Sequence, residues 1–189
     1  MSRQKFETES VIKAAADIFW QNGFNGTSMQ QLVTATGLKP GSIYLAFGNK
    51  EGLFNATVEN YAQASLDMIK QTFAEHEQSN AAVVSFFEKV IQESQQTAYK
   101  CCYLLNSTLE LSHQNPALHT KVAAHLQRIE ALFTRLLEKD NAPAEAHGKA
   151  KAIMMALLGL RAYSYLSPSP AELRQTLKQL LPWLVWPQH

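Results

Sequence analysis

The spacing of polar and glycine residues between Ser28 and Lys50 predicts two short helices joined by a tight turn. Ser28 stands three residues before Gln31, which is the spacing of a helix capping box. Gly37 is suited to end the first helix at a positive φ, and Pro40 suits the first turn of the second. This pattern is typical of a helix-turn-helix, whose second helix enters the major groove of DNA. An αα-corner inside an ordinary helical domain is the alternative.

Two cysteines are the other side chains with evident chemistry. Cys101 and Cys102 are adjacent, which does not suit a structural disulfide framework and favours a cytoplasmic location. The histidines between residues 113 and 125 lack the spacing of metal ligands, and no CxxC or HExxH motif occurs. Neither a phosphate-binding glycine loop nor a serine nucleophile elbow occurs. We therefore expect no enzyme activity, no metal and no cofactor.

Composition places the chain among folded globular proteins. Its 189 residues are 46% hydrophobic and 17% charged, which is enough apolar material for a sizeable core. The first ten residues are polar, so we expect no secretory signal. The longest apolar run, residues 152–160, is too short to cross a bilayer, and we expect no membrane partner.

Net charge gives only a weak indication of a nucleic-acid partner, because it is +1 for the whole chain. Residues 1–50 hold five lysines and arginines against three acidic residues, whereas the remaining residues hold twelve against thirteen. This mild asymmetry favours a few placed phosphate contacts over a broad basic surface.

Apolar positions at helical spacing predict nine helices and no strand, so the expected fold class is all-α. Six of the eight glycines fall in the first 52 residues, where short helices and tight turns are expected. We expect a three-helix helix-turn-helix domain over residues 5–65 and a C-terminal helical bundle over residues 66–189. The helices are expected at about 7–22, 28–37, 40–47, 49–73, 80–96, 102–113, 116–139, 144–167 and 170–185.

One register of apolar, glycine and aromatic positions runs through the first third of the chain: Ile12, Ala15, Ala16, Phe19, Gly23, Phe24, Thr27, Ser28, Leu32, Gly37, Gly41, Ser42, Tyr44, Phe47, Lys50 and Leu53. This series resembles the N-terminal signature of TetR-family transcriptional regulators. The resemblance covers about residues 6–65 and disfavours the αα-corner alternative. It implies a DNA-binding regulator with about nine helices.

The resemblance also implies a set of DNA-contacting residues: Ser28, Gln30, Lys39, Pro40, Gly41, Ser42, Tyr44 and Lys50. Gln30 matches a position that can reach a base edge, and residues 39–42 match the exposed start of the recognition helix. Tyr44 and Lys50 match phosphate-contacting positions. Glutamine can pair with adenine and lysine with guanine, whereas phosphate contacts set the register without identifying bases. A phosphate contact alone for Lys39 and a half-core position for Tyr44 are the alternatives.

The same resemblance implies that the C-terminal helices dimerise and enclose a small-molecule pocket. Leucines at helical spacing on the last two predicted helices support an intersubunit four-helix bundle. A two-fold dimer would place its recognition helices about 34 Å apart, on a near-palindromic operator. The alternative is burial of these side chains within one subunit. The expected interface residues are Ile153, Leu157, Leu160, Leu173, Leu177, Leu180 and Leu184.

The effector is expected to be apolar, aromatic or electrophilic. Aromatic candidates for its pocket are Phe73, Phe87, Tyr103 and Phe133, with ordinary core positions as the alternative. The stretch from Lys100 to Leu111 resembles a K-G-C-x-L-x-N-x-x-x-E-L segment of one TetR subgroup, some members of which sense electrophiles or oxidants. Cys102 matches its cysteine, whereas Cys101 replaces the usual small residue. A lysine neighbour and a helix N-terminus would both lower a thiol pKa. The alternative for Cys102 is a small buried side chain.

We therefore expect a homodimeric repressor that responds to a ligand or to oxidation. The alternative from another class is a helical effector-binding or interaction protein without specific DNA recognition. The operator, the effector, the regulated genes and the sign of regulation are not encoded in any recognisable motif.

Overall fold

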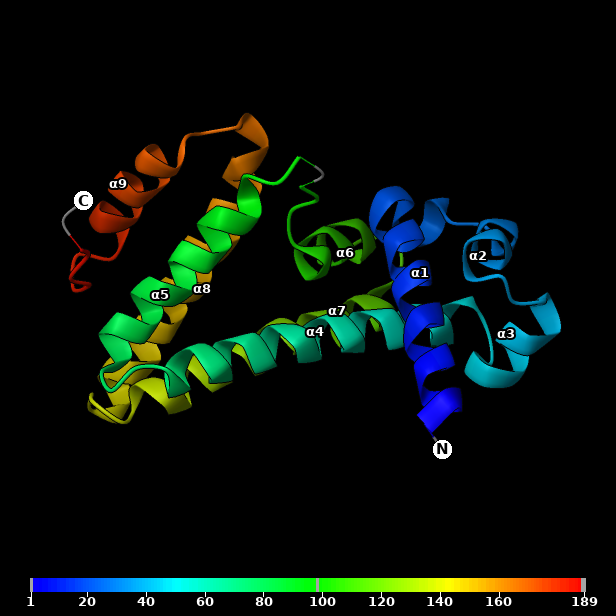
Figure 1. Ribbon diagram of the computed structural model, residues 1–189, viewed down its shortest axis with the longest axis horizontal. Helices are drawn as coiled ribbons and strands as arrows, with labels where there is room; N and C mark the ends of the chain where they lie inside the picture. Colours follow the sequence, from blue (N-terminus) through cyan, green and yellow to red (C-terminus); the bar gives the residue numbers. More distant parts are fainter. Residues whose placement is uncertain (1, 98, 188–189) are drawn as a thin grey trace. The chain divides into compact units, whose positions relative to one another are not determined.

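The computed structural model describes residues 2–97 and 99–187, with side chains from Thr8 onward (Figure 1). Over these residues the chain forms nine α-helices, one short 3-10 helix and no strand, which confirms the predicted all-α class. The helices are α1 (Ser2–Gly26), α2 (Met29–Thr36), α3 (Pro40–Phe47), α4 (Lys50–Ala74), α5 (Ser79–Ser94), α6 (Tyr103–Leu111), α7 (Pro116–Leu137), α8 (Pro143–Tyr163), η1 (Ser164–Leu166) and α9 (Pro170–Leu180).

The chain divides into two compact units. The first comprises the residues up to Gln63 together with Tyr103–His125, and the second comprises Ala64–Cys102 together with the residues from Leu126 onward. Helices α4 and α7 contribute to both units. Along the chain, the first unit gives way to the second between Gln63 and Ala64, within α4, whereas the sequence predicted a boundary after residue 65. Helix α6, however, belongs to the N-terminal unit, because it packs against α1.

The core of the first unit is aromatic. Phe19 of α1 and Phe54 of α4 are buried, and their rings meet edge to face with centroids 5.1 Å apart. Tyr103, the first residue of α6, packs edge-on against Phe54 at 6.0 Å and lies 5.4 Å from the Trp20 ring. Aromatic pairs in such geometries stabilise a core beyond the area that they bury. This cluster fixes α6 to the helices that precede and follow the helix-turn-helix.

Two buried hydroxyl groups, of Thr57 and Tyr103, also form a hydrogen bond within this core. The Thr57 hydroxyl donates a hydrogen bond to the Phe54 carbonyl at 2.7 Å, so its oxygen is left to accept from the Tyr103 hydroxyl at 2.9 Å. Burial raises the pKa of Tyr103 well above its usual value. The phenol therefore stays protonated and keeps donating to Thr57.

The second unit is built on α5, which packs against α8 and α9. Phe86 of α5 lies 5.2 Å from the ring of Phe133 on α7, and both are buried. Arg161 is buried and binds Glu93 through two hydrogen bonds of 3.2 and 3.0 Å. Two such bonds to one carboxylate orient a guanidinium as well as neutralise it. Among the described residues, none of the helices is long and apolar enough to cross a membrane.

Several helix ends differ from the predicted ones. The first helix begins before residue 7 and continues to Gly26, with a break at Gly23, where φ is 74°. The last helix ends at Leu180 rather than near residue 185, because Pro182 disfavours helical geometry at Leu181, whose φ is −125° and ψ 66°. Leu184 therefore lies outside the helix that was expected to present it, although it is buried.

Candidate nucleic-acid interface

The first helix of the predicted motif begins as its sequence indicates. Ser28 Oγ accepts the backbone N–H of Gln31 at 3.2 Å, and Gln31 Oε1 accepts the backbone N–H of Ser28 at 2.8 Å. This reciprocal pair is the predicted capping box. Gly37 ends α2 with a φ of 70°, and its N–H donates to the Val33 carbonyl at 3.0 Å. The turn between α2 and α3 is thereby fixed by local hydrogen bonds.

The second helix, α3, has one buried anchor. Ile43 is fully buried, whereas residues 39–42 and 44–46 are all exposed. Pro40 occupies the first turn, and Lys39 precedes the helix with no hydrogen bond from its side chain to the helix N-terminus. Phe47, at the end of α3, is half-buried, so Ile43 and Phe47 face the core and the exposed residues are left for a partner.

The predicted DNA-contacting residues all lie in the first unit. Seven of the eight are exposed, including Gln30 on α2 and Tyr44 on α3, which keeps 51% of its surface exposed. Only Lys50, at the start of α4, is half-buried. About half of the Tyr44 surface is covered, which is compatible both with a phosphate contact and with the half-core alternative.

Lys50 has a structural partner. Its Nζ donates to the Thr27 carbonyl at 2.7 Å and lies 4.5 Å from the centre of the Phe24 ring. Partial burial lowers the pKa of Lys50, although the nearby Glu110 carboxylate acts in the opposite direction. An ammonium group has three N–H donors, so a phosphate contact is compatible with the bond to Thr27. Lys50 thus ties the start of α4 to the link between α1 and α2.

Glu110, on α6, is a positioning residue that sequence reasoning did not single out. Its carboxylate accepts the backbone N–H groups of Phe24 at 2.9 Å and Asn25 at 2.8 Å. These donors face it because Gly23 takes up a positive φ. The sequence did offer one signal for it, because Glu110 matches the glutamate of the TetR-subgroup segment that the stretch from Lys100 to Leu111 resembles. Glu110 holds the chain immediately before α2.

Leu45 is a second residue that was missed. It lies on α3 between Tyr44 and Ala46, and 91% of its surface is exposed. Its position two residues after the buried Ile43 was the available signal, because residues two apart on a helix point in nearly opposite directions.

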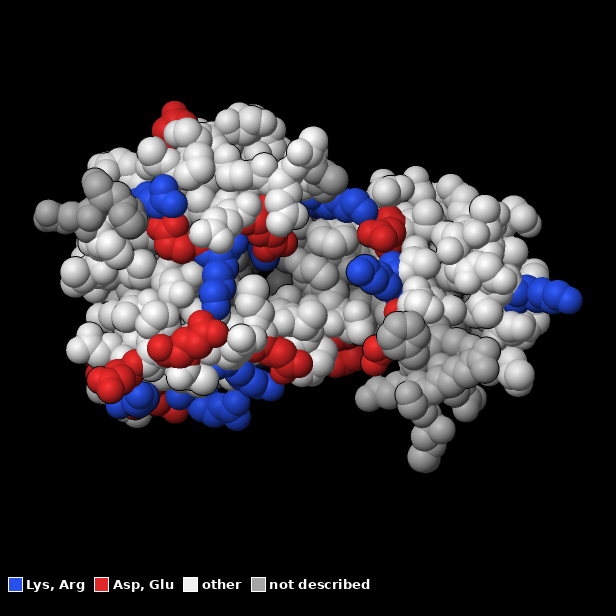
Figure 2. Space-filling model, viewed as in Figure 1, with Lys and Arg blue, Asp and Glu red and all other residues white. Residues whose placement is uncertain are grey.

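The helix-turn-helix carries little charge. Lys39 is the only charged residue between Ile18 and Asn49. On the face that Figure 2 shows, few lysine, arginine or acidic side chains lie over the α2 and α3 region. This distribution agrees with a small number of placed contacts.

The cysteine pair lies in the second unit, directly before α6. Both side chains are buried, with 2% of Cys101 and 5% of Cys102 exposed. Burial raises the pKa of the Cys101 thiol, although a hydrogen bond from the Cys102 backbone opposes this. Cys101 has a φ of 63°, a conformation that glycine adopts more readily. A glycine at this position would adopt the same backbone with less strain.

The aromatic effector candidates are mainly core residues. Phe87, Tyr103 and Phe133 are buried, and Tyr103 belongs to the first unit. Phe73 is half-buried and lines a cavity of 270 Å³ with basic side chains from α4 and α7. Neither Phe87 nor Phe133 lines this cavity. Among the described residues, no group of histidine, cysteine and acidic side chains could hold a metal ion.

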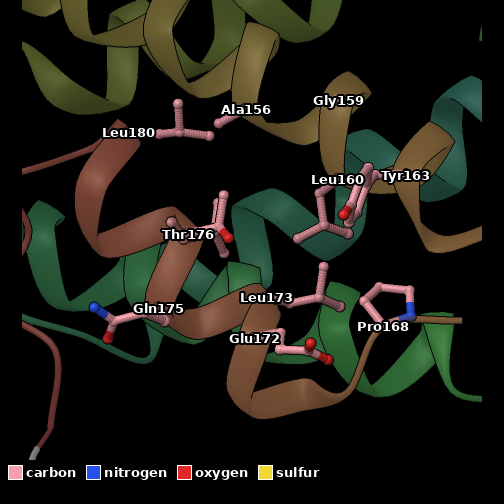
Figure 3. A pocket seen from close by; sticks show the side chains of 11 residues that line it. Ala156, Gly159, Leu160, Tyr163, Pro168, Glu172, Leu173, Gln175, Thr176 and Leu180 are labelled. Atoms are coloured by element: carbon pink, nitrogen blue, oxygen red, sulfur yellow. The ribbon is translucent and has the colours of Figure 1, made fainter. Parts of the chain in front are cut away.

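A groove runs between α8 and α9 (Figure 3). Its volume is 490 Å³, and four of the predicted dimer residues line it: Leu160, Leu173, Leu177 and Leu180. Leu180 is 57% exposed, whereas the other six predicted interface residues are buried within the chain. In Figure 3 the side chains of Leu160 and Leu173 point toward one another across the groove.

The comparisons with known proteins agree with this geometry. A family model described as "Bacterial regulatory proteins, tetR family" matches residues 11–57. The HTH-type transcriptional repressor ComR of Escherichia coli (strain K12) is 29% identical over 147 residues, which are 76% of this chain and 68% of ComR.

Solved structures share the fold over almost the whole chain. A cysteine mutant of the TetR-family regulator CifR, complexed with 26-bp double-strand operator DNA, has a TM-score of 0.80 at 20% identity and covers 94% of this chain and 95% of CifR. The reduced form of E. coli NemR has a TM-score of 0.81 at 17% identity, covering 97% and 99%. The family match over residues 11–57, the curated relatives and the shared fold together support a TetR-family DNA-binding transcriptional regulator.

Proposed function

We propose that this regulator is a repressor that binds a near-palindromic operator as a homodimer and releases it when a small molecule or a cysteine-modifying agent acts on the C-terminal unit. ComR, its relative, is a transcriptional repressor, and CifR forms a complex with operator DNA. A regulator of this kind works in the cytoplasm, where bacterial DNA lies.

The main support for the proposal is that α3 has one fully buried side chain, while most of its other residues are exposed. Ile43 alone is fully buried, and the exposed residues from Lys39 to Ser42 lie at the end of the helix that points into the major groove in helix-turn-helix proteins. Gln30 is exposed near the start of α2. These side chains would contact base edges, while Tyr44 and Lys50 would contact phosphates.

The groove between α8 and α9 supports the dimer. Its lining is mainly apolar and includes the exposed Leu180 and Tyr163. A Cβ on Gly159 would meet no atom within 4 Å, so a second backbone has room to approach α8 there. A two-fold dimer buries the same surface of both copies, and two α8–α9 pairs would form the predicted four-helix bundle.

The proposed release of DNA depends on the direct link along the chain between the cysteine pair and α6. Cys101 and Cys102 directly precede α6, and α6 carries both Tyr103 and Glu110, which hold α1 and α4. Modification of a cysteine, or a ligand that displaces this segment, would move α6 and loosen the links to the helix-turn-helix. A ligand acts in this way only if it binds the two conformers with different affinity. NemR, which shares the fold, was solved in a reduced form.

Selection from random duplex DNA, followed by titration of the selected duplex, tests the proposal. A repressor of this kind enriches an inverted repeat and binds it with two copies of the chain per duplex. Equal and strongly salt-dependent binding to every duplex would instead favour a helical effector-binding protein without specific recognition.

A further inference from the structure

Leu45 points away from the core of its own domain. Successive residues of an α-helix are turned by about 100°, so Leu45 lies about 200° around α3 from the buried Ile43. Its exposed fraction of 91% exceeds that of every other large hydrophobic side chain in the described part of the chain. Leu45 is therefore at the middle of the surface that α3 offers to a partner.

The residue one turn earlier leaves space beside it. Gly41 lies on the same face as Leu45, four positions before it, and a Cβ on Gly41 would meet no atom within 4 Å. Because Gly41 has no side chain, α3 can approach a surface closely along this row. Leu45 then becomes the longest side chain along the row.

Helix α3 offers few polar side chains for identifying bases. Its sequence, PGSIYLAF, contains no charged residue and no amide, and its only hydroxyls are those of Ser42 and Tyr44. Most base pairs are identified in the major groove by arginine, lysine, asparagine or glutamine. The apolar feature of the major groove is the 5-methyl group of thymine, which side-chain methyl groups contact.

We propose that Leu45 contacts the 5-methyl group of a thymine in each operator half-site and so makes the protein prefer an A·T pair at that position. This inference rests on the operator recognition proposed above. Beyond that proposal, it specifies one base of each operator half-site and the side chain that identifies this base. Burial of the methyl group against Leu45 removes apolar surface of both groups from water.

The test replaces single thymines of the selected operator by deoxyuridine, which lacks only the 5-methyl group. At one thymine of each half-site, wild type will bind the deoxyuridine duplex about four-fold more weakly per half-site, the loss that one buried methyl group predicts. With Leu45→Ala the same replacement will change affinity by less than about 1.5-fold, because the contacting side chain is gone.

Two further variants sharpen the cycle. Leu45→Met, which keeps the apolar length, will retain the preference for thymine over deoxyuridine. Leu109→Ala removes another exposed leucine of the first unit, 66% exposed on α6, and will leave the deoxyuridine effect at its wild-type size. Since Leu45 makes little contact in the free protein, Leu45→Ala will unfold at the wild-type temperature.

Two outcomes would overturn the inference while operator binding persists: no thymine at which deoxyuridine weakens binding, or an effect that survives in Leu45→Ala. A failure of wild type to select any sequence would instead contradict the proposed function, so the two failures are distinguishable.

Discussion

Gly23 and Glu110 fit so closely that Gly23 has no room for a side chain. A Cβ at Gly23 would lie 2.6 Å from Glu110 Oε2, and the φ of Gly23 is +74°. The same carboxylate accepts the N–H groups of Phe24 and Asn25. The break in α1, the binding of α6 and the entry to α2 therefore depend on one contact.

This contact predicts non-additive substitutions. Gly23→Ala will lower the free energy of unfolding by more than the 1–2 kcal/mol expected, roughly, for a left-handed alanine alone, because Glu110 must also move. In a Glu110→Ala background the clash is gone, and the same change will cost only about the backbone term. Urea unfolding of the four proteins measures the cycle. Additive costs would show that Gly23 and Glu110 do not constrain one another.

The buried Tyr103 and the half-buried Tyr99 predict a loss of stability in alkali. Burial raises the pKa of both Tyr103 and Tyr99, whose hydroxyls donate to Thr57 and to the Arg161 carbonyl. Above about pH 10 the unfolded tyrosines lose protons that the folded ones keep, so the unfolded state binds fewer protons and stability falls as pH rises.

Tyr103→Phe separates this effect from simple loss of a bond. It will cost about 1 kcal/mol at pH 7, where the Thr57 hydroxyl loses its donor, and it will flatten the fall in stability above pH 10. Urea unfolding at a series of pH values provides the measurement. A fall as steep as that of wild type would contradict the assignment to Tyr103.

Removal of the expected phosphate contacts predicts weaker DNA binding with an intact oligomer. Tyr44→Phe combined with Lys50→Met will lower operator affinity and reduce the slope of log affinity against log salt by about 1 for each lost ionic contact. The matched control is Lys121→Met, which removes an exposed lysine paired with Glu51 at 2.9 Å. Unchanged affinity and slope in the double variant would place the phosphate contacts elsewhere.

A charge in the α8–α9 groove predicts a monomer. Leu180→Glu places a carboxylate on an exposed residue of this groove and will shift sedimentation toward the monomer while the helical circular dichroism stays unchanged. Leu109→Glu, at an exposed leucine of α6, serves as the control and will keep the wild-type oligomer. If Leu180→Glu sediments as wild type does, the two copies associate through another surface.

Cysteine modification predicts release of DNA. N-ethylmaleimide added to the wild-type complex will lower operator affinity, because a bulky adduct cannot fit where Cys102 is 5% exposed. Cys102→Ser will keep its affinity after the same treatment, whereas Cys101→Ser will still respond. Equal release from Cys102→Ser and from wild type would exclude Cys102 as the sensor.

The parts of the fold that follow local rules were predictable. The Ser28 capping box, the positive φ of Gly37 and the first-turn position of Pro40 depend on residues within one or two turns of each other. Pro182 could also have been used to end α9 earlier.

Contacts between distant parts of the chain could not be predicted in this way. The bond from Phe24 to Glu110 joins residues 86 positions apart, so no local spacing reports it. The leucines of α8 and α9 have the same helical spacing whether a second copy or the same chain buries them. The exposure of Leu45 depends on which side of α3 faces the core. The sequence of a short apolar helix does not show which side that is, so Leu45 could not be identified from it.

The central claim is that the exposed surface of α3 recognises a DNA sequence. Fluorescence anisotropy of the selected operator and of a scrambled duplex of the same length and composition, at physiological salt, tests it most directly. We expect the protein to bind the operator at least about 10³-fold more tightly than the scrambled duplex. Equal affinities for the two duplexes would contradict it.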